Sequence, residues 1–290
     1  MSRQDNVLEA IQHGSKSSKG WRTRCPFCVR QGHQTKKQNL YVSAKSGKWF
    51  CYRCHSVGYL DGFDHEAREE ELGEIATFAP PRGWTPLGWG EGASSMFASQ
   101  AREYAHKRGL STVLMQTVQV GISTLPPENP EEELDWRGRL IIPILDAEHK
   151  TWVGFVGRDY TGRLEPTYQY PDGMSRGRIL YNARALLEVT DEPVLVVEGV
   201  LDALQFWPDA VAVLGTWTKQ HVALLTQSNR PVLAVLDGDA WRKGEGLSLA
   251  LKLAGVRSGW LRLPPGMDPD EIKPWILNEI SQWKSHQKNT

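Results

Sequence analysis

Two segments, VLVVEGVLD (residues 194–202) and VLAVLDGDA (residues 232–240), decide the fold that this sequence predicts. Each begins with a short β-branched apolar run behind a proline, which is typical of a strand buried on both faces of a parallel sheet. The runs end at Glu198 and Asp237, and Asp202 and Asp239 follow within a few residues. Ligands of open parallel sheets bind beyond the carboxyl ends of the strands. We therefore expect these carboxylates to meet at one edge of an α/β sheet.

Ionised carboxylates that share one site repel one another unless a cation lies among them. Oxygen-only ligands suit Mg²⁺ or Mn²⁺, which keep several waters and also bind phosphate. A third acidic segment, LPPGMDPDEI (residues 263–272), places Asp268 and Asp270 after another expected strand and could extend the same edge. The alternative for any one of these acids is a solvated loop residue or a helix N-cap. Taken together, they predict a divalent-metal site.

The overall charge indicates no class of partner, because 34 Lys or Arg balance 34 Asp or Glu among the 290 residues. Its distribution is uneven: residues 1–60 carry eleven basic residues against two acidic ones. No apolar run reaches the length of a membrane span, and the N-terminus lacks a signal-peptide core. These features predict a cytoplasmic protein with no membrane partner.

All four cysteines lie in the basic first segment and form two pairs, Cys25-Pro-Phe-Cys28 and Cys51-Tyr-Arg-Cys54. In a reducing compartment two such pairs predict one tetrahedral zinc site. Strand-like residues 39–44 and 48–50 flank a turn between the pairs, which predicts a zinc ribbon too small to fold without its ion. Four sulfurs leave no open position on the metal, so we expect the zinc to be structural.

Cationic and aromatic side chains alternate along this ribbon. Cations that neutralise phosphates beside rings that stack on bases are typical of a platform for single-stranded nucleic acid. The ribbon residues that we expect to contact a template are Arg22, Lys36, Lys48, Trp49 and Arg53. The alternative is a solvated basic face in which some of the rings fill the small core.

Composition divides the chain into five segments: a zinc ribbon (1–63), an acidic and then Pro/Gly-rich linker (64–92), a basic α+β subdomain (93–190), an acidic α/β subdomain (191–273) and a short polar tail (274–290). Capping serines precede two expected helices in the basic subdomain. Arginines beside glycine-rich turns can approach a polyanion closely. The arginines expected to bind nucleotide or template are Arg139, Arg158, Arg176 and Arg178; the alternative is that they are surface residues of a sheet.

Eight motifs stand in an order that resembles bacterial DnaG-type primases, over residues 20 to 272: CPFC and CYRC, AREYAHKRGLS, RLIIPILDAEHKTWVGFVGR, PTYQYPDGMSRGRILYNA, VVEGVLDAL, LGTWT, VLDGDA and LPPGMDPDE. Each motif alone is weak, but the ordered set is specific. The acidic subdomain resembles the Toprim domain of that family.

The resemblance implies roles for particular residues. Glu198 corresponds to the family's glutamate, an acid/base or metal-site residue, and Asp237 and Asp239 would be catalytic with it. Asp202, Asp237 and Asp239 correspond to metal-binding aspartates, and Asp268 and Asp270 to a further metal-site pair. Arg158 closes an FGGR-like turn, and Arg176 and Arg178 lie in the basic stretch that follows.

The implied activity is a DNA primase that makes short RNA primers on single-stranded DNA from nucleoside triphosphates, with Mg²⁺ or Mn²⁺ in catalysis. The sequence departs from the family pattern in having four cysteines and no histidine at the zinc, in Thr167 at a usually basic position, and in Asp239-Ala-Trp-Arg-Lys-Gly in place of Asp-x-Ala-Gly. No helicase-interaction region and no GxxxxGK[ST] loop are found. A stand-alone phage or plasmid primase, with a replicative helicase acting in trans, fits these features best.

Two alternatives share some of these features. A RecR-like recombination adaptor also combines four zinc-binding cysteines with a Toprim domain, but it would need neither the basic middle region nor the full acidic set. A Toprim nuclease uses similar acids and metal, although the ribbon and the arginine-rich strands favour synthesis over cleavage.

Overall fold

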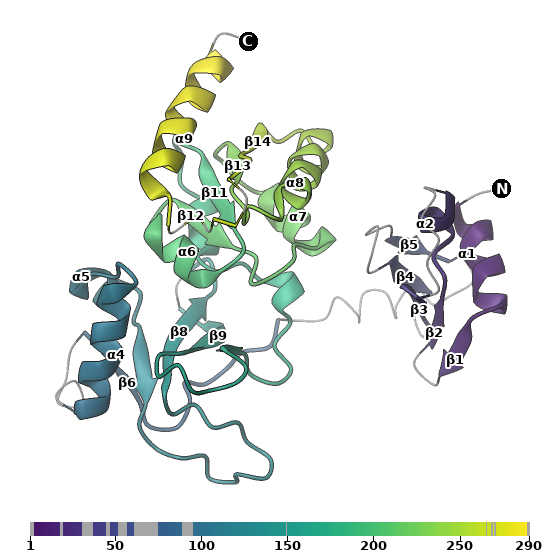
Figure 1. Ribbon diagram of the computed structural model, residues 1–290. Coiled ribbons are helices and arrows are strands. Elements are labelled where there is room, and N and C mark those ends of the chain that lie inside the picture. Colours follow the sequence, from purple (N-terminus) through teal and green to yellow (C-terminus); the bar gives the residue numbers. More distant parts are fainter. Residues whose placement is uncertain are drawn as a thin grey trace. The chain divides into compact units, whose positions relative to one another are not determined.

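The computed structural model describes residues 3–17, 20–30, 37–44, 47–51, 57–60, 75–88, 95–148, 150–264, 266, 267, 269 and 271–288. The chain divides into two compact units, Met1–Glu74 and Ile75–Thr290, here called the N-terminal and C-terminal units (Figure 1). The acidic part of the expected linker lies almost entirely outside the described residues. Among the described helices, none combines the length and the apolar character that a membrane crossing requires.

The N-terminal unit is built on an antiparallel sheet of order β1-β2-β3-β4-β5. Its strands are β1 (Ser15–Ser17), β2 (Gly20–Thr23), β3 (Leu40–Ser43), β4 (Lys48–Cys51) and β5 (Val57–Tyr59). Two helices, α1 (Arg3–Gln12) and α2 (Pro26–Arg30), accompany the sheet. The hairpin that the sequence predicts is the β3–β4 pair, in which Leu40 lies opposite Cys51.

Trp49 belongs to the small core of this unit. Only 2% of the side chain is exposed, and its ring stacks on that of Phe27 with centroids 5.2 Å apart. Val42 and Leu60 are buried in the same cluster. The expectation that Trp49 stacks on template bases is therefore wrong: a unit with so few large apolar side chains uses this ring to fill its interior.

The first sheet of the C-terminal unit is antiparallel, with order β10-β9-β8-β7-β6. Its strands are β6 (Trp84–Pro86), β7 (Gly121–Ser123), β8 (Arg139–Leu145), β9 (Trp152–Asp159) and β10 (Tyr168–Gln169). Strand β6 comes from the segment expected to be a linker. Helices α4 (Met96–Lys107) and α5 (Thr112–Thr117) precede β7, and the side chains of Ser95 and Ser111 cap them as the sequence predicts.

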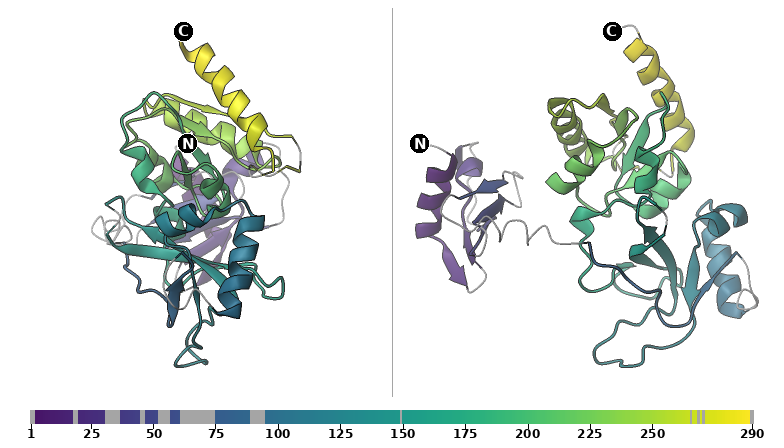
Figure 2. Two further views of the ribbon diagram at one scale, coloured as in Figure 1. Left: turned by 90° about the vertical axis from the view of Figure 1, so that its left-hand side faces the viewer. Right: turned by 180° about the vertical axis from the view of Figure 1, so that it is seen from behind.

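The second sheet is wholly parallel, with order β12-β11-β13-β14. Its strands are β11 (Val194–Val197), β12 (Ala210–Ala212), β13 (Val232–Ala234) and β14 (Ser258–Trp260). Helices α6 (Val200–Gln205) and α9 (Lys273–Lys288) lie on one side of it, and α7 (Lys219–Leu225) and α8 (Trp241–Leu253) lie on the other (Figures 1 and 2). This confirms the α/β class predicted from the two acidic segments.

The two sheets share one hydrophobic core. Leu195 and Val197 of β11 belong to the same buried cluster as Ile142 and Val156 of the antiparallel sheet. The alternate residues Val194 and Val196 belong to a second cluster with residues of α7 and α8. Because successive side chains of a strand point to opposite faces, β11 is covered on both sides, which explains its uninterrupted apolar sequence.

Helix α9 occupies the segment expected to be a short polar tail. Ile276 is fully buried and Ile280 is 9% exposed, and both join the shared core. The apolar positions of this helix are few and lie among polar residues, so composition alone hides them.

Candidate functional site

Glu198 and Asp237 follow adjacent parallel strands. Strand β11 pairs with β13 so that Val194 lies opposite Val232 and Val196 opposite Ala234. The pairing continues past β13, because the Val235 amide donates to the Val196 carbonyl at 2.8 Å. Both carboxylates therefore leave the sheet at the same edge, as the strand pattern predicts. We call this the acidic edge.

Asp202 and Asp239 complete the described acids of this edge. Glu198, Asp202 and Asp237 are partly buried, whereas Asp239 is exposed. Asp202 lies in the first turn of α6, where the helix dipole favours a negative charge. Its carboxylate folds over Gly199, since a Cβ atom at Gly199 would lie 2.5 Å from Asp202 Oδ2. Glycine at position 199 thus leaves room for this carboxylate.

The third acidic segment runs directly against the turn that contains Asp237. The Gly238 amide donates to the Met267 carbonyl at 3.1 Å. A Cβ atom at Gly238 would lie only 2.2 Å from the Pro264 carbonyl oxygen, so this close approach requires glycine. Asp268 and Asp270 themselves lie outside the described residues; of this segment, Pro264 and Met267 lie against the turn that contains Asp237.

The described carboxylates of the acidic edge, Glu198, Asp202, Asp237 and Asp239, do not form a preformed metal cage. In the part of the chain that the structure describes, the only group of three or more potential ligand atoms within 4.8 Å of one another is formed by cysteines. Mg²⁺ is commonly held through one or two carboxylates, with waters and substrate phosphates as the other ligands. The donor set of the acidic edge fits an ion of this kind.

Arg158 of β9 is held by two tyrosines. Its Nε donates to the Tyr104 hydroxyl of α4 at 2.8 Å, and its guanidinium carbon lies 4.5 Å from the centroid of the Tyr168 ring. Burial raises the pKa of Tyr168 to about 12, against the positive charge of Arg158 and with a smaller contribution from Asp202.

The basic turn Arg176–Arg178 is fixed to the start of α7. His221 Nε2 lies 3.0 Å from the carbonyl oxygens of both Arg176 and Ile179, and the Thr218 hydroxyl donates to the Gly177 carbonyl. Burial lowers the pKa of His221, which keeps its ring neutral at pH 7. The guanidinium of Arg176 is exposed and lies 4.4 Å from the centroid of the Tyr170 ring.

Arg139 differs from the other expected phosphate ligands. It is 2% exposed, and its Nη1 donates to the carbonyls of Pro166 at 2.7 Å and Thr167 at 3.3 Å. Burial lowers the pKa of Arg139, and the nearby carboxylates act in the opposite direction. This side chain holds the loop before β10 against β8, so its expected contact with nucleotide or template is wrong.

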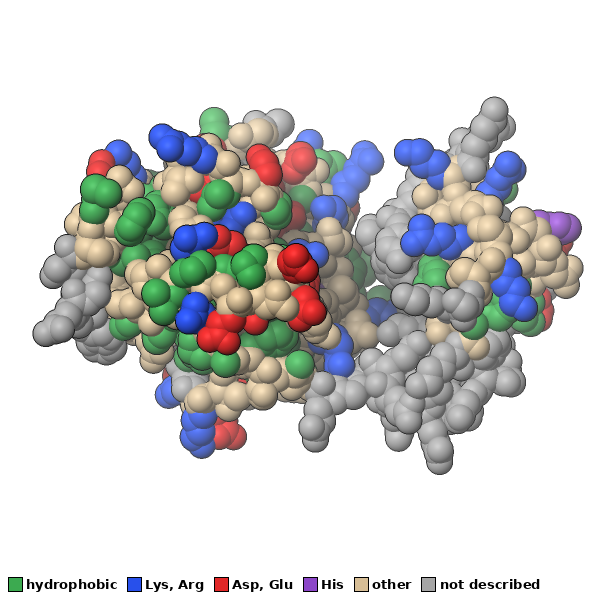
Figure 3. All heavy atoms as spheres, turned by 90° about the horizontal axis from the view of Figure 1, so that it is seen from below, with side chains coloured by type: hydrophobic (Ala, Val, Ile, Leu, Met, Phe, Trp, Pro, Cys, Tyr) green, Lys and Arg blue, Asp and Glu red, His purple; other side chains and the backbone are tan. Residues whose placement is uncertain are grey.

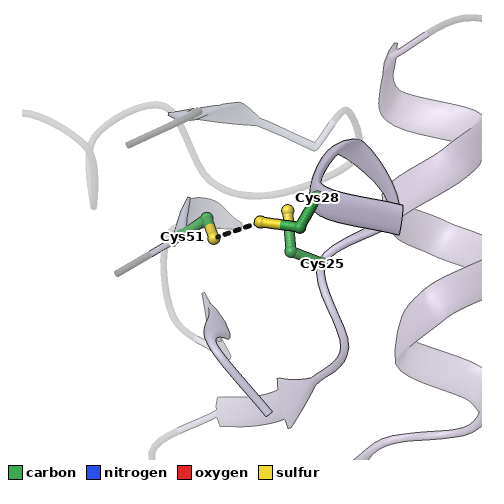
Figure 4. Close-up of side chains that lie close together, drawn as sticks. All are labelled: Cys25, Cys28 and Cys51. Carbon is green, nitrogen blue, oxygen red and sulfur yellow. Dashed lines mark hydrogen bonds between the residues drawn. The ribbon is translucent and has the colours of Figure 1, made fainter. Parts of the chain in front are cut away.

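Three of the four cysteines converge in the N-terminal unit (Figure 4). Cys25 immediately precedes α2, Cys28 lies within α2, Cys51 ends β4, and all three are buried. Cys28 Sγ lies 3.6 Å from Cys51 Sγ, which is far longer than a disulfide bond. Two thiolates on one tetrahedral zinc ion are separated by about 3.8 Å. The arrangement fits three ligands of a zinc site; Cys54 lies outside the described residues.

Only part of the expected template surface of the ribbon can be placed. Arg22 is exposed on β2. Lys36, Arg53 and the side chain of Lys48 lie outside the described residues. On the face shown in Figure 3, the charged side chains described in the N-terminal unit are mostly Lys and Arg, whereas both signs alternate on the C-terminal unit.

No protein-family model matches the chain. Curated proteins do: it is 26% identical to the DNA primase of Haemophilus influenzae over 88% of its own length, and 26% identical to that of Escherichia coli K12 over 92%. The chain is similar in sequence to bacterial DNA primases. It spans about half the length of these primases, 54% and 57% respectively.

The chain is also similar in fold to solved primase structures. A structure of the DnaG catalytic core is 27% identical, covers 67% of this chain and superposes with a TM-score of 0.52; the chain covers 74% of it. A DnaG catalytic domain bound to single-stranded DNA matches with the same identity over 67% of this chain and 73% of its own, with a TM-score of 0.51. The zinc-binding and RNA polymerase domains of the Aquifex aeolicus primase cover 99% of this chain and 85% of their own at 21% identity, with a TM-score of 0.52, which shows likeness of fold.

Three residues that hold the candidate site together were not predicted from the sequence. Tyr104 orients Arg158, and Thr218 and His221 hold the basic turn. Tyr104 follows the buried Ala101 by three positions of α4, and this helical spacing could have indicated that its ring faces inward. The partners of Thr218 and His221 are more than 40 residues away, and no local pattern indicates them.

Proposed function

We propose that this chain is a DNA primase that joins ribonucleotides into short primers on a single-stranded DNA template. The observation that carries the proposal is the pairing of β11 with β13, which brings Glu198 and Asp237 to one edge. The similarity to the DnaG catalytic core, at 27% identity, supports the same proposal.

The proposed reaction is attack of a primer 3′-hydroxyl on the α-phosphorus of a nucleoside triphosphate. A new P–O bond forms, the bond to the β-phosphate oxygen breaks, and pyrophosphate leaves. Mg²⁺ or Mn²⁺ bound at the acidic edge would stabilise charge on the attacking and leaving oxygens. Glu198 would accept the proton of the hydroxyl or help to hold the ion, with Asp237, Asp239, Asp202, Asp268 and Asp270 as its metal-binding partners.

Arg158, Arg176 and Arg178 are proposed to bind phosphates of nucleotide or template. Arg158 is oriented by hydrogen bonding and by ring stacking, which fixes the plane of the guanidinium before a ligand arrives. Arg176 is exposed and its turn is anchored to α7. A pre-positioned guanidinium loses little conformational entropy when it binds a phosphate.

A structural zinc ion bound by Cys25, Cys28, Cys51 and Cys54 is proposed for the N-terminal unit, with template contact by its basic surface, including Arg22, Lys36, Lys48 and Arg53. A DnaG domain of known structure is bound to single-stranded DNA, and we extend that ligand to this chain. Nucleoside triphosphates as substrates and a replicative helicase acting in trans are part of the same proposal. A phage or plasmid origin stays a prediction.

The test is a priming assay with single-stranded DNA, Mg²⁺ and labelled ribonucleotides, resolved on a sequencing gel. We expect short template-dependent oligomers from the wild type and none from Asp237→Asn, with unchanged circular dichroism. Asp172→Asn, an exposed aspartate of the same unit, is the matched control and should retain wild-type yield. Shortened DNA in place of new oligomers would indicate a nuclease. The absence of both products would favour a binding adaptor. Either outcome would overturn the proposal.

A further inference from the structure

The ring of Trp241 lies directly after the acidic turn. Trp241 is the first residue of α8, two positions beyond Asp239. Its ring stacks on that of Trp260, the last residue of β14, with centroids 5.8 Å apart and 21° between the planes. Both side chains are partly exposed. The pair is therefore an aromatic surface that is partly open to solvent.

Two guanidinium groups flank this aromatic pair. The guanidinium carbon of Arg262 lies 4.5 Å from the centroid of the Trp241 ring, and that of Arg242 lies 5.1 Å from it. Both arginines are exposed. Within the described residues neither forms an ion pair, even though the exposed Glu245 is only one turn away on α8.

Stability alone does not account for this arrangement. An exposed contact between a cation and a ring contributes only about 0.5–1 kcal/mol, and two guanidinium groups that share one ring repel each other. The positive charges lack carboxylate partners among the described residues, so the cluster is complementary to an anion that has flat groups of its own. A polynucleotide has both, because its bases stack on aromatic rings and on guanidinium planes while its phosphates bind arginine.

The cluster lies at the same end of the sheet as the acids. Strand β14 pairs in parallel with β13, and the Leu261 amide donates to the Ala234 carbonyl at 2.9 Å. Arg262 therefore continues from β14 beside the segment that continues from β13 to Asp237. A strand held at Arg262 would pass next to the acidic edge.

We propose that Trp241, Arg242 and Arg262, here called the Trp241 platform, bind a single-stranded polynucleotide beside the acidic edge. Bases stack on the layer of indole and guanidinium groups, and the flanking phosphates contact the two arginines. The proposal rests on the proposed function in taking this strand to be the template or the new primer. Binding itself requires no transfer chemistry.

The test measures binding of a fluorescein-labelled deoxythymidine 20-mer to the full-length chain by fluorescence anisotropy, without divalent ions. We expect Trp241→Ala and Arg262→Ala each to weaken binding about 5- to 10-fold, in line with the loss of one stacked base. Trp241→Phe should stay within about twofold of the wild type because it keeps a ring. Arg262→Ala should also lower the slope of log Kd against log salt by about 1.

The matched control is Arg257→Ala. Arg257 is exposed just before β14 and lies 3.7 Å from Asp191, so its loss removes the same charge without touching the platform. We expect less than a twofold effect. If Trp241→Ala fails to fold, Arg242→Ala and Arg262→Ala carry the test, since both side chains are exposed. Binding by Arg242→Ala and Arg262→Ala equal to that of Arg257→Ala would overturn the proposal.

Two further arms assign the strand and separate this proposal from the primase assignment. A larger loss for the DNA 20-mer than for an RNA 20-mer assigns the platform to the template, and the reverse assigns it to the primer. If the platform variants show the expected binding losses but the wild type makes no primers, the proposed function is overturned and the platform proposal holds. A wild type that makes primers, with platform variants that bind normally, overturns the platform alone.

Discussion

The Nε atom of Arg158 donates a hydrogen bond of 2.8 Å to the hydroxyl of Tyr104 and so ties β9 to helix α4 across 54 residues of sequence. Tyr168 covers the guanidinium from another side, with its ring centroid 4.5 Å away. The orientation of this arginine is therefore set by neighbours that contribute no charge of their own to a phosphate. That relationship leads to the first prediction.

Tyr104→Phe should reduce primer synthesis while leaving the fold intact. The substitution removes one hydrogen bond to a charged group, worth about 1.5–3 kcal/mol at most, and keeps the ring. We expect kcat/KM for nucleotide to fall about 10-fold. In Arg158→Lys we expect kcat/KM to fall further, because an ammonium group cannot stack on a ring or bind a phosphate as a planar fork. Glu103→Gln, at an exposed position of the same helix, should behave as wild type. A Tyr104→Phe enzyme with unchanged kcat/KM would contradict the role assigned to this hydroxyl.

Gly238→Ala should disrupt the acidic edge. Its new Cβ would lie 2.2 Å from the Pro264 carbonyl oxygen, so the turn that carries Asp237 must move away from the third acidic segment. We expect primer synthesis to fall by at least about 10-fold, with a lower melting temperature measured by calorimetry. The control is Gly246→Ala within α8, where the new Cβ would be an ordinary 3.6 Å from the Trp217 ring. That change should raise stability by up to about 1 kcal/mol, because alanine is the better helix former.

Cys51→Ser should release zinc and unfold the N-terminal unit alone. The small core of this unit contains the cysteines, whereas the two clusters of the C-terminal unit contain no residue before Leu87. Zinc content and differential scanning calorimetry measure the two effects: we expect loss of one equivalent of zinc and of one transition, with the other transition unchanged. Val29→Ser, at a 56% exposed position of α2, should keep both the zinc and the transition. Full zinc occupancy in Cys51→Ser would show that this cysteine is not a ligand.

Acid should weaken the contact between the basic turn and α7. Burial lowers the pKa of His221 in the folded protein, so the unfolded chain takes up this proton first and stability falls as the pH drops below about 6.5. Protonation would also place a hydrogen on Nδ1, which now accepts from the Thr218 amide at 3.1 Å. Unfolding free energies measured from pH 5 to 8 should show this loss in the wild type and a flatter profile in His221→Gln. The exposed His13→Gln variant should keep the wild-type profile for the C-terminal unit.

The sequence predicted those parts of the fold that local patterns encode. Apolar runs that end at Glu198 and Asp237 indicated neighbouring parallel strands, and capping serines at positions 95 and 111 marked two helix starts correctly. The fate of individual side chains was harder to predict. Trp49 and Arg139 are of residue types that are typical of nucleic-acid surfaces. In the structure Trp49 fills a core and Arg139 binds backbone carbonyls, because tertiary packing decides which face of a strand is covered.

The contacts that orient the candidate site were beyond the reach of sequence patterns. Tyr104 and Arg158 are separated by 54 positions, and His221 and Arg176 by 45. Periodicity and motif spacing report on neighbours along the chain, whereas these pairs exist only after two sheets have closed on a common interior. The same holds for Gly238. This position requires glycine because of the carbonyl of Pro264, 26 residues downstream.

The interior that joins the antiparallel and parallel sheets also bears on how this protein can change. Leu195 and Val197 lie in the same apolar cluster as Ile142 and Val156. Cutting the chain near residue 190 would therefore expose a hydrophobic face to solvent on each fragment. The border between basic and acidic sequence marks a change of chemistry within a single cooperative body. A substitution in the basic or the acidic subdomain therefore changes the stability of both, and we expect neither subdomain to fold when it is replaced alone.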